Sequence, residues 1–127
     1  MSELTKYRMI IAIDFDGTIC RSDFPVITGA MPYAKEAINQ LHKDGHYIII
    51  WTCRTGKNLL DAINWLLQEG IAFDRVNDHN PDNAAQYGHD GKKVYADLYI
   101  DDKNLGGFIG WKEALQQIGS PFDGCWP

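Results

Sequence analysis

The sequence contains few cysteines, and it lacks the segments that would send a chain into or across a membrane. Its three cysteines form no Cys-x-x-Cys pair and cannot all be bridged to one another, which is typical of free thiols in a reducing compartment. It has neither an apolar signal segment at the N-terminus nor an apolar run long enough to span a bilayer. These absences predict a cytoplasmic protein without a membrane partner.

An excess of basic residues is also missing, since the formal net charge is −5 at pH 7. This balance argues against a nucleic-acid backbone as the main partner, although a local basic patch stays open. The chain has 127 residues, without repeats or low-complexity tracts, and 45% of them are hydrophobic. This is enough for one globular domain with a moderate core, which we expect to span residues 1–127.

Apolar runs alternate with helical spacing along the chain. Strands are predicted at 8–13, 47–51, 72–76 and 97–100, and helices at 32–44, 59–70 and 111–118. Residues 19–31 and 77–92 show no period and are predicted to be loops. The alternation indicates an α/β fold, a three-layer αβα sandwich around a mostly parallel, Rossmann-like sheet. Ligands of such sheets bind beyond the carboxyl ends of the strands.

The most informative stretch is Asp14-Phe15-Asp16-Gly17-Thr18, which directly follows the first predicted strand. In extended backbone, Asp14 and Asp16 point to the same side, and Phe15 points the other way into packing. Two adjacent carboxylates repel each other and need a cation or a shared proton. Asp and Gly are also common turn residues, so this stretch alone leaves a plain turn open.

This stretch resembles motif I of the haloacid dehalogenase (HAD) superfamily of phosphotransferases, which reads Asp-x-Asp-Gly-Thr after a strand. Thr52, at the end of the second predicted strand, matches motif II, where a hydroxyl donates to a phosphoryl oxygen. Asp101 and Asp102, after the fourth strand, resemble the two-acid form of motif IV. Because the carboxyl ends of parallel strands share an edge, we expect these residues to converge. The resemblance covers nearly the whole chain and implies the HAD-type fold.

Two basic positions are less closely defined by the sequence. The resemblance implies a motif III lysine upstream of motif IV. Lys93 is favoured because it is nearest the fourth strand, with Lys92 second and Lys103 third. Arg54 has the geometry to bind a phosphate or another substrate anion bidentately, although a solvated surface arginine explains it equally well. Thr18 is placed with Arg54 among the substrate-binding residues.

The resemblance implies a Mg²⁺-dependent phosphatase. Asp14 is expected to attack phosphorus and form an aspartyl-phosphate, while Asp16 acts as general acid and then as general base. The expected metal ligands are Asp14, Asp102 and the backbone carbonyl of Asp16, with Asp101 hydrogen-bonded to a metal-bound water. Together with the metal, Lys93 would offset the phosphoryl charge. Family dehalogenases lack the second acid, so Asp16 favours phosphatase chemistry.

The gap after motif I holds only a predicted loop before the helix that begins near Pro32. The chain therefore resembles a family member without a cap domain and with an open site. Open sites in this family tend to serve large substrates or to be closed by a partner subunit. We therefore expect a phosphorylated substrate that is bulky, or a homo-oligomer.

Two alternatives stay open. A response-regulator receiver domain also combines an α/β sheet, Mg²⁺ and a phosphorylated aspartate, and Asp74 near the third predicted strand would be its acceptor. However, Asp-x-Asp-Gly-Thr is not a receiver signature. A non-catalytic HAD-like protein would instead bind phosphate without turnover.

Overall fold

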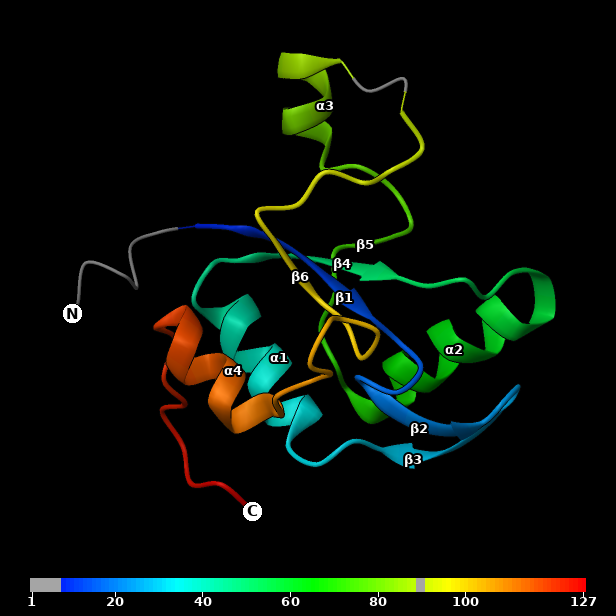
Figure 1. The fold of residues 1–127 in the computed structure, drawn as a ribbon, viewed down its shortest axis with the longest axis vertical. Helices are drawn as coiled ribbons and strands as arrows, with labels where there is room; N and C mark the ends of the chain where they lie inside the picture. The colour runs from blue at the N-terminus through cyan, green and yellow to red at the C-terminus, as the bar shows by residue number, and fades with distance from the viewer. Residues whose placement is uncertain (1–7, 89–90) are drawn as a thin grey trace.

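The structure, a computed structural model, describes residues 8–88 and 91–127. Four strands of these residues form a sheet in the order β5-β4-β1-β6, with every neighbouring pair parallel. They are β1 (Ile10–Asp14), β4 (Tyr47–Trp51), β5 (Arg75–Val76) and β6 (Leu98–Ile100). The carboxyl ends of these strands therefore share one edge, as the alternation of elements predicted (Figure 1).

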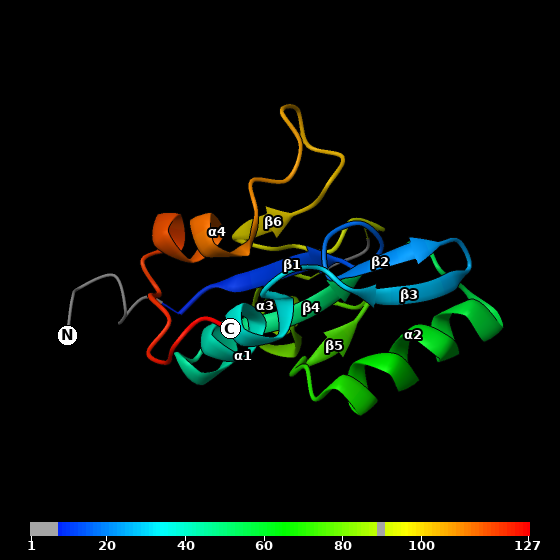
Figure 2. The ribbon, with the colours of Figure 1, turned by 90° about the horizontal axis from the view of Figure 1, so that it is seen from below.

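The two faces of the sheet are covered differently. One face packs against three helices, α1 (Ala34–Lys43), α2 (Gly56–Glu69) and α4 (Trp111–Ile118). Its central strand residues are all buried: Ile11, Ile13, Ile48 and Ile50. On the other face, Ala12 and Ile49 pack against Val94 and Ala96 of the segment that leads into β6. The predicted α/β fold is confirmed, with helices flanking a mostly parallel sheet (Figure 2).

The predicted loop at 19–31 is wrong, because this stretch forms an antiparallel hairpin. Its strands are β2 (Cys20–Asp23) and β3 (Val26–Ala30), and they make a separate two-stranded sheet. Pro25 lies in the turn between them, where a proline breaks no strand pairing. The hairpin is stabilised by the pairing of its two strands. The composition of either strand alone does not indicate a strand, so the sequence pattern did not predict it. The hairpin lies beside the carboxyl end of β1 (Figure 1).

The third predicted strand, 72–76, is shorter in the structure, and side chains on both sides of it add hydrogen bonds to β4 or to the residue that follows β4. Before the strand, the carboxylate of Asp74 accepts a hydrogen bond from the backbone N–H of Ile48 at 2.8 Å. After it, the side chain of Asn77 bonds the backbone of Thr52. Only Arg75–Val76 is left as regular strand.

The predicted loop at 77–92 contains a short helix, α3 (Pro81–Tyr87). The side chain of Asn80 caps this helix by accepting a hydrogen bond from the N–H of Asn83 at 2.9 Å. Asn followed by Pro is a typical helix start, but the polar composition of the stretch obscured it. None of the helices that the structure describes is long and apolar enough to pass through a membrane.

Candidate active site

Three chain segments bring polar residues to the carboxyl edge of the sheet. Asp14 is the last residue of β1, Thr52 follows β4, and Asp101 and Asp102 follow β6. The register pairs Asp14 with Trp51 and Ile13 with Ile100, so the three strand ends lie level. The parallel topology therefore brings these residues to one edge of the sheet, as expected from the sequence.

A tight turn after β1 directs the residues that follow Asp14. The carbonyl of Phe15, whose side chain is buried, accepts hydrogen bonds from the N–H groups of Ile19 at 3.0 Å and Cys20 at 3.1 Å. Gly17 has a φ of +83°, and a Cβ built there would lie 2.1 Å from Oδ2 of Asp102. Only glycine therefore permits this turn and the close approach of Asp102.

Asp14, Asp101 and Asp102 form a compact acidic cluster. Each offers a carboxylate oxygen, and these oxygens lie within 4.8 Å of one another. Burial, followed by the negative charges of Asp101 and Asp102, raises the pKa of Asp14 to about 7. The hydroxyl of Thr18 donates to Oδ2 of Asp14 at 3.3 Å and opposes this shift only in part. The cluster carries more negative charge than its described neighbours balance.

Asp102 gives a second indication that the cluster suits a cation. Its Oδ1 is buried and receives no hydrogen bond from the described part of the chain. A buried carboxylate oxygen without a donor is costly, and a bound cation removes that cost. Clustered carboxylate oxygens are ligands that Mg²⁺ prefers. The residues present therefore fit a divalent, oxygen-liganded metal ion held by Asp14, Asp102 and Asp101.

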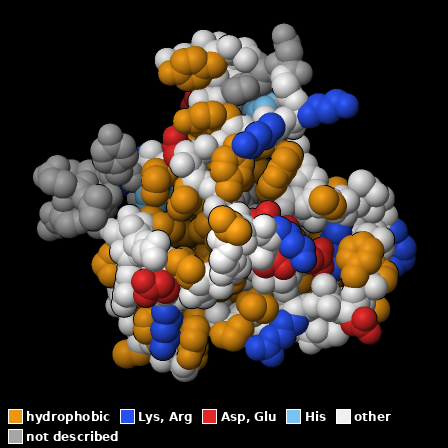
Figure 3. Space-filling model, viewed as in Figure 1, with side chains coloured by type: hydrophobic (Ala, Val, Ile, Leu, Met, Phe, Trp, Pro, Cys, Tyr) orange, Lys and Arg blue, Asp and Glu red, His pale blue; other side chains and the backbone are white. Residues whose placement is uncertain are grey.

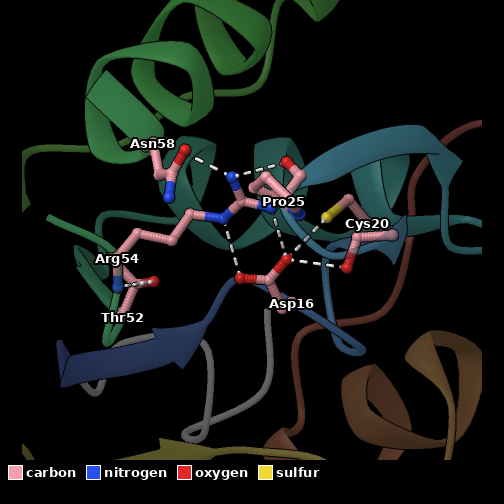
Figure 4. A network of polar contacts seen from close by, with 7 residues as sticks. Asp16, Cys20, Pro25, Thr52, Arg54 and Asn58 are labelled. Carbon is pink, nitrogen blue, oxygen red and sulfur yellow. Dashed lines mark hydrogen bonds and ion pairs between the residues drawn. The ribbon is translucent and has the colours of Figure 1, made fainter. Parts of the chain in front are cut away.

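Asp16 lies two residues beyond Asp14 in a very different environment (Figure 4). The guanidinium of Arg54 donates to both of its carboxylate oxygens, from Nε to Oδ2 at 2.8 Å and from Nη2 to Oδ1 at 2.7 Å. The hydroxyl of Ser22 donates to Oδ1 at 2.8 Å. Partial burial tends to raise the pKa of Asp16, but these hydrogen bonds and the Arg54 charge outweigh it and lower the pKa below its usual value.

Arg54 is an interior residue that connects three parts of the fold. Its side chain is fully buried, and its Nη1 donates to the carbonyls of Pro25 in the hairpin turn and Asn58 in α2 at 3.0 and 3.3 Å. The rings of Phe15 and Phe24 lie 5.3 and 4.9 Å from its guanidinium carbon. The structure thus places the guanidinium on Asp16, whereas the sequence prediction had assigned it to a substrate anion.

Thr52 is held at the edge of the site by its backbone and its hydroxyl. Its N–H and its carbonyl bond the side chain of Asn77, both at 2.8 Å, and its hydroxyl accepts the N–H of Arg54 at 3.1 Å. Neither Asn77 nor Ser22 was singled out by sequence reasoning, because both lie in stretches predicted to be loops. The sequence signal for Asn77 was its position directly after the third predicted strand, 72–76.

The lysines differ in where the structure places them. The ammonium of Lys93 lies 4.9 Å from the ring centre of Tyr99. The ammonium of Lys103, ranked third by the sequence, lies 3.8 Å from Oδ2 of Asp102. A surface hollow of about 470 Å³ is lined by the charged side chains of Arg21, Lys103, Asp16 and Asp102. Figure 3 shows acidic and basic side chains side by side on this face of the molecule.

The parallel sheet, the Asp-x-Asp-Gly-Thr turn and the acidic cluster together define a hydrolase of the HAD-like class. The sequence profile of the haloacid dehalogenase-like hydrolase family matches residues 11–79, more than half of the chain. The chain belongs to this family.

A solved structure supports the same fold. The "conserved protein coded by locus from Bacteroides thetaiotaomicron" is similar to this chain, with a TM-score of 0.80 and 36% sequence identity. The similarity covers 89% of this chain and 91% of that one. No functionally curated protein matches the sequence.

Proposed function

We propose that this protein is a Mg²⁺-dependent phosphatase that hydrolyses a phosphate monoester through an aspartyl-phosphate on Asp14. The observation that carries the proposal is the contrast between two acids of one turn. Asp14 lies in a cluster of three carboxylates that a cation would neutralise. Asp16 is instead paired with Arg54 through two hydrogen bonds. A nucleophile beside a metal and a separate acid–base group are what this reaction requires.

In the first step, a carboxylate oxygen of Asp14 attacks phosphorus, and the bond from phosphorus to the leaving oxygen breaks. The leaving oxygen is protonated by Asp16, which takes this proton from solvent. In the second step, Asp16 takes a proton from water, and the water oxygen bonds to the phosphorus of the aspartyl-phosphate. The bond from phosphorus to the Asp14 oxygen breaks, which releases inorganic phosphate and regenerates the Asp14 carboxylate. The lowered pKa of Asp16 keeps it ionised at rest, which is the form needed to activate water.

Mg²⁺ bound by Asp14, Asp102 and Asp101 would supply positive charge that offsets the phosphoryl oxygens. We assign Asp16 to this set through its backbone carbonyl, because its side chain is engaged by Arg54. The hydroxyl of Thr52 would donate to a phosphoryl oxygen.

A lysine is also needed to complete the charge balance of the phosphoryl group. We keep Lys93 as the candidate from the family pattern. The distance of 3.8 Å from the Lys103 ammonium to Asp102 supports Lys103 as the second candidate. Thr18 orients Asp14 through its hydrogen bond, and this contact supports a positioning role for it beside the substrate.

The geometry argues against the receiver alternative. Its phosphate acceptor would be Asp74, but the carboxylate of Asp74 accepts the N–H of Ile48, near the start of β4. Asp14 lies at the opposite end of the sheet, level with Trp51 at the end of β4. An acceptor at Asp74 would therefore be separated from the acidic cluster by the length of a strand.

We further propose that the site serves a bulky phosphorylated substrate or is completed by a second copy of the chain. The described segment between motif I and α1 is a short hairpin, so it supplies no cap domain over the acids. Gel filtration tests the second possibility. A monomer that turns over small sugar phosphates efficiently would contradict both.

The direct test is hydrolysis of an aryl phosphate by wild-type protein and by Asp14→Asn, with Mg²⁺ and with a chelator. We expect Mg²⁺-dependent turnover that falls at least a thousandfold in Asp14→Asn, because the amide cannot act as the nucleophile. Folded wild-type protein that binds Mg²⁺ and phosphate without turnover would instead support the non-catalytic alternative.

A further inference from the structure

Asn77 is the residue that fastens Thr52 to the rest of the sheet. Its Oδ1 accepts the N–H of Thr52 and its Nδ2 donates to the carbonyl of Thr52, both at 2.8 Å. Its own N–H donates to the carbonyl of Ile50 at 2.8 Å. Asn77 thus contacts β4 at two successive points, through its backbone and then through its side chain.

This arrangement continues the sheet beyond the end of its backbone. In a parallel ladder, a residue whose N–H bonds one strand residue offers its carbonyl to the residue two positions further on. At Asn77 the backbone turns away with a φ of +52°, and its side-chain amide takes over the pairing with Thr52. The amide carries both a donor and an acceptor, as a peptide group does.

The two hydrogen bonds between the Asn77 side chain and the Thr52 backbone form a clamp. This clamp affects the hydroxyl of Thr52 as well as its backbone. With both backbone polar groups fixed, the direction of the Thr52 side chain is set by the remaining contact, in which its Oγ1 accepts the N–H of Arg54 at 3.1 Å. That contact uses an acceptor site of the hydroxyl and leaves its proton available to a phosphoryl oxygen. By fixing the Thr52 backbone, Asn77 therefore helps to set the direction in which the Thr52 hydroxyl donates.

We propose that Asn77 is a positioning residue that holds the Thr52 hydroxyl in the direction needed to bind the transferring phosphoryl group. This inference rests on the phosphatase function proposed above. The backbone at this position suits asparagine and glycine, which adopt positive φ more readily than other residues. Of these two, only asparagine also supplies both hydrogen bonds.

The backbone conformation makes Asn77→Gly a clean test, because glycine keeps the positive φ and removes both side-chain hydrogen bonds. Asn77→Asp is the near-isosteric partner, which replaces the donor to the Thr52 carbonyl with an acceptor. Asn80→Gly is the matched control. It removes an asparagine side-chain hydrogen bond three residues away, at the cap of α3, and leaves Thr52 untouched.

The decisive experiment is a double-mutant cycle of Asn77→Gly with Thr52→Val, measured as kcat and KM for an aryl phosphate with Mg²⁺. We expect Asn77→Gly to lower kcat/KM ten- to a hundredfold in the wild-type background and less than twofold in the Thr52→Val background. Asn80→Gly should change kcat/KM less than twofold. An equal loss from Asn77→Gly in both backgrounds would overturn the proposal, because the effect would not pass through the hydroxyl.

A second measurement separates this inference from the proposed function. Hydrogen exchange of the Thr52 amide reports the clamp without any turnover. We expect Asn77→Gly to speed this exchange at least tenfold, while the amide of Ile48, bonded to Asp74, changes less than threefold. Unchanged exchange at Thr52 would overturn the clamp itself. If Asn77→Gly speeds the exchange but the wild-type protein has no phosphatase activity, the clamp is confirmed and its role in catalysis is rejected.

Discussion

The acidic cluster and the Asp16–Arg54 pair lie side by side at one edge of the sheet, yet their charges are handled in opposite ways. Asp14 faces Asp101 and Asp102, and its pKa is raised to about 7, first by burial and then by their charges. Asp16 faces a buried guanidinium, and its pKa is lowered. Two acids of one five-residue motif therefore reach different protonation behaviour through their neighbours alone.

The contrast shows how a short motif can supply two functions. The acids of the cluster have no described cation near enough to neutralise all three, so this region is prepared for a metal ion. The Asp16 region is already neutralised, and its partner Arg54 is fixed by Pro25 and Asn58 from two other elements. The hairpin and α2 therefore hold the second acid in position before any ligand arrives.

The most disruptive way to break this contrast is to remove Arg54. In Arg54→Met, Asp16 loses both guanidinium hydrogen bonds and the hairpin loses its anchor at Pro25. We expect the free energy of unfolding to fall by roughly 2–4 kcal/mol, because a buried ion pair is broken while Asp16 keeps partial contact with solvent. Urea denaturation measures this loss, and kcat/KM should fall at least tenfold.

Arg75→Met is the control, since Arg75 forms an exposed pair with Asp78 and should contribute little. Adding Asp16→Asn to Arg54→Met should recover part of the lost stability, because no unpaired carboxylate remains. If Arg54→Met unfolds at the same urea concentration as Arg75→Met, then the pair does not hold this region together.

The pH dependence of stability without metal sharpens the contrast from the other side. The pKa of Asp14 rises from 3.8 to about 7 on folding, so between pH 4 and pH 7 the folded protein binds more protons than the unfolded chain. The contribution of Asp14 to stability is therefore present below pH 4 and is lost as the pH rises toward 7. Urea denaturation in a chelator should follow this trend.

Asp14→Asn cannot titrate at this position and should lack that component of the pH dependence. Saturating Mg²⁺ should also oppose the loss at pH 7, because the ion binds the ionised carboxylates of the folded state. A wild-type protein whose metal-free stability shows the same pH profile as Asp14→Asn would contradict the charge imbalance assigned to the cluster.

The smallest expected effect concerns Lys103, whose ammonium lies 3.8 Å from Asp102 and is largely exposed. Lys103→Met removes a positive charge that competes with Mg²⁺, so we expect Mg²⁺ to bind two- to threefold more tightly at low salt. The difference should disappear at high salt, because exposed charges are screened. Lys57→Met, which removes another exposed lysine beside Asp61, should leave Mg²⁺ affinity unchanged in titration calorimetry at both salt concentrations.

The sequence was informative where one local pattern decides the structure. A continuous apolar run placed β4 at residues 47–51, and apolar residues at helical spacing placed α4 at 111–118, both with the observed bounds. The Asp-x-Asp-Gly-Thr turn was recognisable because glycine at position 17 is required both for the positive φ and for the approach of Asp102.

The sequence was less informative where two distant segments decide together. The hairpin depends on pairing across a turn, and the role of Arg54 depends on an acid 38 positions earlier in the chain. An arginine after a strand looks the same in sequence whether it faces a substrate or a buried carboxylate. The role of Asn77 is hidden for a similar reason, because its partner Thr52 lies 25 positions earlier, directly after β4.

The most direct measurement is calorimetric titration of Mg²⁺ into wild-type protein, Asp102→Asn and Asp16→Asn, without substrate. We expect wild type to bind one Mg²⁺, Asp102→Asn to bind it at least tenfold more weakly, and Asp16→Asn to stay within threefold of wild type. This pattern would show that the cluster, and not the side chain of Asp16, holds the metal. Equal weakening in both variants, or no Mg²⁺ binding by the wild-type protein, would contradict the division of roles between the two regions.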